Sequence, residues 1–139
     1  MKIKSNILLL TITIMSVLAF SSCQESVRER LERETQEYTR KNCPKPEYQD
    51  IIILDSIVCH NDESNDYKFC YSVVADSLQI DFLISQKSEL NDKLLAGVIN
   101  SADLRHVKNA GLNIIYSYYI AETGEHLFDF CFTPEDYLK

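Results

Sequence analysis

The chain has 139 residues, with 21 acidic and 14 basic side chains and a formal net charge of −7. This acidity argues against DNA, RNA or an anionic lipid surface as a partner, since each would require a basic patch. Glycine and proline number three each, which argues against collagen-like or low-complexity segments.

The first residues have the order of a secretory signal. Lys2 and Lys4 give a positive start, residues 7–20 are almost wholly apolar, and two serines stand directly before Cys23. The apolar run is shorter than the roughly 20 residues that a membrane-spanning helix needs. We therefore predict a signal peptide over residues 1–22.

Cys23 has two interpretations. Residues 19–23 resemble the lipobox of bacterial lipoproteins, in which the signal is cut before the cysteine and the cysteine is then acylated on its thiol and amine, a palmitate-type modification. Phe20 departs from the usual leucine of that motif. Alternatively, Ala19 to Ser21 is an ordinary A-x-A-like site, and Cys23 is a simple cysteine of a secreted protein.

Counting cysteines favours lipidation. The chain has five, and an odd number leaves one unpaired thiol in an oxidising compartment. With Cys23 lipidated, the other four can form two disulfides. Cys59 and Cys70 flank one turn and are the first choice, which leaves Cys43 to pair with Cys131. Free buried thiols remain an alternative. No close Cys/His spacing suggests a metal site.

The segment after Cys23 is predicted to be a charged helix that acts as a tether. Residues 24–42 carry opposite charges at i,i+4 spacing and only a thin apolar stripe, so this helix would bury little. Pro44 and Pro46 then end it. We therefore divide the chain into a lipidated helical tether, 23–42, and a single domain, 43–139.

The first half of that domain reads as a hairpin followed by helix. Residues 51–59 are rich in β-branched side chains, and residues 67–75 alternate apolar and polar, which predicts two paired strands. Residues 76–100 change to helical spacing, although Phe82 falls off the apolar face. Ser88 could cap a helix that begins late.

The second half ends in another hairpin. A short helix is predicted over 104–110, with Gly111 as its left-handed cap. Residues 113–121 and 127–133 are strands with matching aromatic faces, joined by a turn at Gly124. The predicted fold is α+β, with an N-terminal charged helix and then hairpin–helices–hairpin forming a four-stranded antiparallel sheet packed on helices.

Several of these segments resemble one family. Asn42-Cys43-Pro44, Leu104 to Gly111 and the Gly111…Tyr116-Ser117-Tyr118 hairpin, with Thr133-Pro134-Glu135-Asp136 at the end, are similar to a group of small bacterial envelope lipoproteins. These proteins share a G-x-x-x-x-Y-x-Y hairpin near the C-terminus. Because the group has no established activity, the resemblance implies an envelope location and transfers no functional residue.

No catalytic pattern stands out. The chain lacks G-x-S-x-G, P-loop and H-E-x-x-H motifs, so neither an enzyme activity nor a cofactor is predicted. Cys59 and His60 are adjacent on a strand and point to opposite faces. A cluster of carboxylates near one sheet end is better explained as a solvated acidic rim: Glu122, Glu125, Asp129, Glu135 and Asp136.

The sequence therefore predicts a non-catalytic lipoprotein that is anchored through Cys23 and binds another envelope protein. The anchor could lie in the inner or outer membrane, with the domain in the periplasm or at the cell surface. One alternative is an inhibitor or immunity protein that neutralises a basic hydrolase or toxin. Another is a carrier for a small apolar ligand between sheet and helices.

Overall fold

The computed structural model describes residues 25–138, so the predicted signal peptide and Cys23 lie outside the described residues. The domain is α+β and has one five-stranded sheet in the order β1-β2-β3-β4-β5. The strands are β1 (Lys45–Tyr48), β2 (Ile52–Cys59), β3 (Asp66–Val73), β4 (Asn113–Ile120) and β5 (His126–Phe132). The helices are α2 (Val27–Asn42), α3 (Ser77–Ser85), α4 (Lys87–Asn100), α5 (Arg105–Asn109) and α6 (Pro134–Tyr137).

The sheet is mixed, whereas four antiparallel strands were predicted. The two predicted hairpins, β2–β3 and β4–β5, are both present. They meet through a parallel pairing of β3 with β4, because three helices carry the chain back to the starting end of β3. The fifth strand, β1, is a short edge strand that contains Pro46, a residue that sheets accept mainly at their edges.

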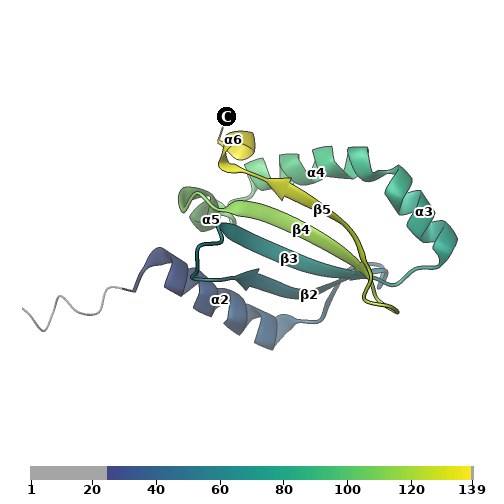
Figure 1. Ribbon diagram of the computed structural model, residues 1–139, viewed down its shortest axis with the longest axis horizontal. Coiled ribbons are helices and arrows are strands. Elements are labelled where there is room, and N and C mark those ends of the chain that lie inside the picture. The colour runs from purple at the N-terminus through teal and green to yellow at the C-terminus, as the bar shows by residue number, and fades with distance from the viewer. Residues whose placement is uncertain (1–24, 139) are drawn as a thin grey trace, which may run out of the picture.

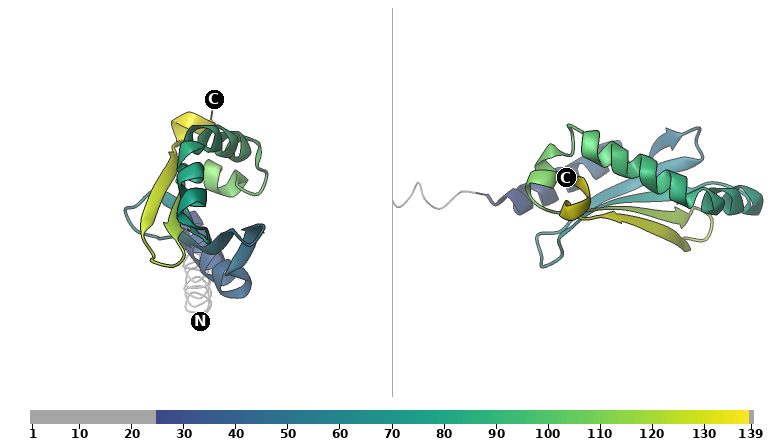
Figure 2. Two further views of the ribbon diagram at one scale, coloured as in Figure 1. Left: turned by 90° about the vertical axis from the view of Figure 1, so that its right-hand side faces the viewer. Right: turned by 90° about the horizontal axis from the view of Figure 1, so that it is seen from above.

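The helices gather on one face of the sheet and leave the other face open (Figures 1 and 2). The sequence predicted α2 to bury little, yet this helix packs beside β2. The Thr39 hydroxyl donates to the Ile57 carbonyl at 3.1 Å and accepts from the Ile57 amide at 2.9 Å. Leu31 and Thr35 are buried. The charged helix is therefore a packed part of the domain.

The core lies between the helices and the aromatic face of the sheet. The predicted matching of the last two strands is confirmed, since Tyr116 pairs with Phe130 and Tyr118 with Phe128. Every side chain of the core cluster falls between Leu31 and Tyr137. A chain that begins at Gln24 therefore keeps all of them.

The helical region differs from its prediction in one respect. Residues 76–100 form two helices that break at Gln86, and Ser88 lies inside α4 rather than capping it. Gly111 and Gly124 have φ of +67° and +71°, as their predicted cap and turn roles require. The break at Gln86 lets α3 and α4 take different directions (Figure 1).

Leu112 offers a test of this core. Its side chain is fully buried, so Leu112→Ala should lower the free energy of unfolding by about 2–5 kcal/mol in urea denaturation. Leu78→Ala is the matched control, because Leu78 is 80% exposed and should change stability by less than about 0.5 kcal/mol. Equal effects of the two substitutions would contradict the described core.

Candidate binding groove

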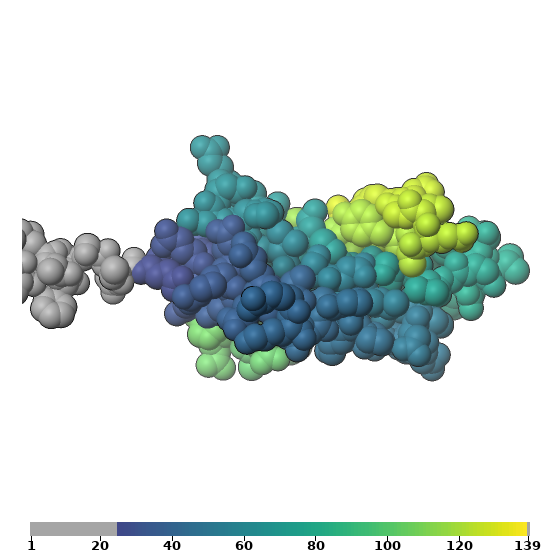
Figure 3. Space-filling model, turned by 90° about the horizontal axis from the view of Figure 1, so that it is seen from below, coloured from purple at the N-terminus to yellow at the C-terminus, as the bar shows by residue number. Residues whose placement is uncertain are grey.

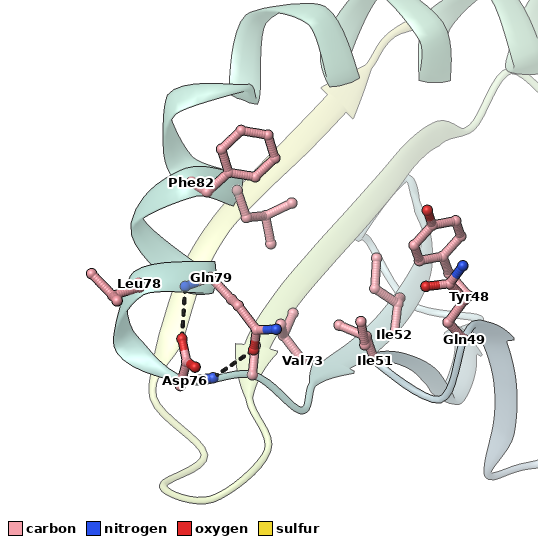
Figure 4. Close-up of a pocket in the computed structure, with 11 residues that line it drawn as sticks. Tyr48, Gln49, Ile51, Ile52, Val73, Asp76, Leu78, Gln79 and Phe82 are labelled. Atoms are coloured by element: carbon pink, nitrogen blue, oxygen red, sulfur yellow. Dashed lines mark hydrogen bonds between the residues drawn. The ribbon is translucent and has the colours of Figure 1, made fainter.

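A groove of about 620 Å³ opens between α3 and the turn that joins β1 to β2 (Figure 4). Its floor comes from the ends of β2 and β3, and α3 forms one wall. Most of the lining side chains are apolar: Tyr48, Ile51, Ile52, Val73, Ala75, Leu78, Phe82 and Leu83, together with Gln49, Asp76 and Gln79. The groove is thus an apolar concavity at one end of the sheet.

Helix α3 is held in place at its first turn. The Asp76 carboxylate accepts from the Gln79 amide at 2.9 Å, and the Gln79 side chain accepts from the Asp76 amide at 3.0 Å (Figure 4). This reciprocal capping box satisfies backbone donors that the helix leaves free. It fixes where the helix begins, directly after β3.

The same helix exposes large apolar side chains. Phe82 is 67% exposed and Leu78 is 80% exposed, while no residue of α3 is fully buried. Leu83 is the side chain of this helix that packs against the core cluster. Single exposed apolar residues are ordinary, but several beside an apolar concavity mark a candidate interaction site.

The opposite wall depends on a tight turn. Gln49 and Asp50 both have positive φ, and the Ile51 amide donates to the Tyr48 carbonyl at 2.8 Å. Asn, Asp and Gly tolerate this left-handed backbone best, so Asp50 suits its position better than Gln49 does. The turn leaves Tyr48 59% exposed beside the groove, across from Phe82 (Figure 4).

The aromatic face of the sheet is packed rather than hollow. Phe69 stacks on Tyr116 with ring centroids 4.9 Å apart, and Tyr71 stacks on Tyr118 at 5.2 Å. Burial raises the pKa of Tyr116 and of Tyr118 to about 12, so these phenols stay protonated at neutral pH. A ligand between sheet and helices would have to displace these rings.

The four cysteines proposed as disulfide partners are free thiols in the structure. Cys59 pairs with Tyr67, and Cys70 pairs with Ser56, so the two cysteines are three positions out of register. They therefore point to opposite faces of the sheet and cannot be bridged without backbone movement.

The second predicted disulfide, between Cys43 and Cys131, also does not fit the structure. Cys43 lies two residues before β1, the strand at one edge of the sheet, and Cys131 lies on β5 at the other edge. Four strand spacings separate the two edges, roughly 19 Å. Burial raises the pKa of the Cys43, Cys59 and Cys131 thiols above the ordinary value, which disfavours the reactive thiolate.

The predicted acidic rim is divided between the two ends of the sheet. Glu122 and Glu125 lie in the β4–β5 turn, whereas Glu135 and Asp136 lie in α6, after the far end of β5. Asp129 is on β5 and forms a 2.8 Å contact with the Nε2 atom of His126. The single cluster predicted from the sequence is therefore wrong.

In the described residues, the polar contacts of His126 and His60 are with carboxylates rather than with a nucleophile. Asp129, the strand partner of Ser117, forms its 2.8 Å contact with His126, so a carboxylate and not the imidazole lies opposite this serine. His60 lies 3.9 Å from Glu32 on another part of the surface. Within residues 25–138, no three His, Cys, Asp or Glu side chains gather in a way that could hold a metal ion.

The sequence interpretation missed the groove itself. Its walls come from segments more than twenty residues apart, around Tyr48 and around Phe82, and sequence spacing does not bring them together. The one available signal was Phe82, which falls off the apolar face expected for its helix.

In the part of the chain that the structure describes, no helix has the length and apolar character needed to cross a bilayer.

A mixed five-stranded sheet with helices on one face and an apolar groove at one end defines a small α+β domain whose most distinctive surface is apolar. The family model "Domain of unknown function (DUF8479)" matches residues 26–128, so the chain belongs to this family. No curated protein matches the chain in a sequence comparison.

Three solved structures share the fold. A Pseudomonas aeruginosa "putative secreted protein" has a TM-score of 0.66 at 17% identity, over 79% of this chain and 91% of that one. The pilotin EpsS of the Vibrio vulnificus type 2 secretion system gives 0.52 at 14%, covering 79% and 90%. The type II secretion pilotin AspS of Vibrio cholerae gives 0.50 at 10%, covering 79% and 91%. At these identities the likeness shows the fold alone.

Thiol labelling tests the described cysteine environments. Cys131 is exposed and Cys59 is buried, so iodoacetamide should modify Cys131 well before Cys59 in the native chain, as followed by peptide mass spectrometry. Partial desolvation of the sulfur and the nearby carboxylates of Asp66, Asp136 and Asp129 raise the pKa of Cys131, so its labelling rate should still be rising above the pKa of an ordinary thiol. A Cys59–Cys70 or Cys43–Cys131 disulfide in a non-reducing peptide map would contradict the structure.

Proposed function

We propose that this chain is a membrane-anchored lipoprotein of the bacterial cell envelope whose domain binds another envelope protein and performs no catalysis. The observation that carries the proposal is the groove beside α3, where Tyr48, Leu78 and Phe82 remain exposed on the folded domain. Exposed apolar side chains around a concavity are the usual mark of a protein interface.

The fold neighbours support the same class of function. Two of them are pilotins that belong to type 2 secretion systems, and a member of such a system works together with other proteins. Because one fold can carry many functions, the binding site is inferred from the groove and not from the similarity to these structures.

The start of α2 and the groove lie at opposite ends of the domain. Helix α2 begins four residues after Cys23, and its first turn is tied to the β2–β3 loop, where the Arg28 guanidinium donates to the Ser64 carbonyl at 3.1 Å. Figure 1 shows α3 at the end of the molecule away from the start of α2. A lipid on Cys23 would therefore hold the domain close to the bilayer, with the groove directed away from it.

The proposed anchor has a direct test. Cys23→Ser should abolish incorporation of radiolabelled palmitate in cells and move the protein from the membrane fraction to the soluble envelope fraction, because a dual or triple acyl anchor is what retains it. Cys131→Ser is the matched control, since Cys131 is an exposed thiol on β5 and should keep both label and membrane association. Unchanged labelling of Cys23→Ser would refute lipidation at this residue.

The binding role is tested by a pull-down from detergent-solubilised envelope with the immobilised chain from Gln24 to Lys139. One stoichiometric partner should bind to the parent chain and be lost from the double variant Leu78→Ser/Phe82→Ser. Ile99→Ser is the control, because Ile99 is an exposed apolar residue on a different helix, α4. If no stoichiometric partner bound at any salt concentration, the proposed protein-binding function would be wrong.

A further inference from the structure

We infer that the groove beside α3 binds an amphipathic segment of its partner whose apolar side chains fill the groove and whose flanking residues are basic. This inference rests on the proposed protein-binding function and specifies the chemistry of the partner. It follows from the apolar lining, from the charges around the groove, and from the failure of three other occupants to fit.

The apolar part of the match comes from the two walls. Phe82 on α3 and Tyr48 on the β1–β2 turn stand on either side of the groove, with Ile52 and Val73 below them (Figure 4). The four side chains belong to segments that are fixed separately, α3 by its capping box and the turn by its own hydrogen bonds. A segment lying between the walls would bury apolar surface on both, worth roughly 25 cal/mol for each Å² removed from water.

The charge around the groove is predominantly negative. The two segments that line it, residues 46–52 and 73–83, contain no lysine or arginine and carry Glu47, Asp50, Asp76 and Asp81. Lys45 offsets one of these charges, because its ammonium lies 2.9 Å from Glu47. The remaining carboxylates leave a net negative potential over an apolar surface.

A third segment adds to this potential. The amide of Ala121 donates to the carbonyl of Val73 at 3.0 Å, which holds the β4–β5 turn beside the same end of the sheet. Figure 3 shows that turn near the end of the molecule formed by α3, away from the first turns of α2. The turn carries Glu122 and Glu125. Basic residues flanking the bound segment would therefore be attracted from two sides.

Three other occupants fit less well. The chain's own first residues would have to reach the groove from the start of α2, which lies at the end of the domain away from α3 (Figure 1). A second copy related by two-fold symmetry would bring the same carboxylates against one another. An anionic bilayer would be repelled by them, whereas an exposed basic amphipathic segment would not.

The test uses two fluorescein-labelled synthetic helical peptides of equal length, one of leucine and lysine and one of leucine and glutamate. The protein is the chain from Gln24 to Lys139, which retains the whole core. Fluorescence anisotropy should show that the Leu/Lys peptide binds and the Leu/Glu peptide does not. Raising the salt concentration should weaken the Leu/Lys complex, because exposed charges are screened.

Variants then locate the binding. Phe82→Ser with Leu78→Ser should weaken binding of the Leu/Lys peptide by about a hundredfold, and Glu47→Lys with Asp81→Lys by about tenfold with loss of the salt dependence. Ile99→Ser should bind like the parent chain. All of these side chains are exposed, so circular dichroism of each variant should match that of the parent.

Each other outcome would overturn the inference. Equal binding of the Leu/Glu peptide would contradict the claim that the bound segment has basic flanking residues. Unchanged binding of the Leu/Lys peptide after Phe82→Ser with Leu78→Ser would show that the groove is not its binding site. Binding of phosphatidylglycerol vesicles would assign the groove to lipid. A dimer of the parent chain that dissociates in the Phe82→Ser/Leu78→Ser variant would assign the groove to a second copy. A partner that is still pulled down by the Phe82→Ser/Leu78→Ser variant would show that the partner does not bind at the groove. The protein-binding function would then still stand.

Discussion

The parallel pairing of β3 with β4 is the constraint from which the rest of the domain follows. Eight consecutive residue pairs, from Asp66 with Asn113 to Val73 with Ile120, hold these two strands side by side. Parallel neighbours cannot be joined by a tight turn, so the chain must return along the sheet before β4 can begin. Helices α3, α4 and α5 make that return, and their position on one face creates the core.

The groove is a consequence of the same crossover. Strand β3 ends at Val73, and the capping box starts α3 a few residues later, beyond the end of this central strand. The break at Gln86 then turns the chain into α4, which reaches back over the sheet and buries Val98. Because α3 overhangs the end of the sheet, its apolar side chains have only a partial surface to cover. Phe82 and Leu78 are left without a packed environment within the described domain.

Local features of this fold were predictable from the sequence, and the distant pairings were not. The two hairpins were predicted because each joins neighbouring segments with complementary periodicity, as in the pairing of Tyr116 with Phe130. Nothing local distinguishes a parallel from an antiparallel meeting of those hairpins. The proposed Cys59–Cys70 bridge failed because it assumed a turn centred midway between the cysteines, whereas the actual register pairs Cys59 with Tyr67. An offset of three positions reverses the face of the sheet.

The same reasoning explains why the sequence did not predict the groove. The acidic composition and the lipobox-like start are properties of the chain as a whole, so the sequence could predict an exported protein and leave a basic partner as one alternative. The groove, by contrast, exists only when the turn after Tyr48 is brought beside α3. Its acids were visible in the sequence, but the three segments that carry them, the β1–β2 turn, α3 and the β4–β5 turn, come to one end of the molecule only through folding.

Site-specific photocrosslinking in intact cells would test the binding role of the α3 surface most directly. A photoreactive phenylalanine analogue at position 82 preserves the ring of Phe82, and the same analogue at position 99 reports on an exposed site of α4. We expect position 82 to give one discrete adduct, of higher mass than the chain itself, whose crosslinked peptide contains lysine or arginine beside apolar residues. Position 99 should give no such adduct. A protein adduct from position 99 alone, or only lipid adducts from position 82, would contradict a protein-binding groove at this end of the domain.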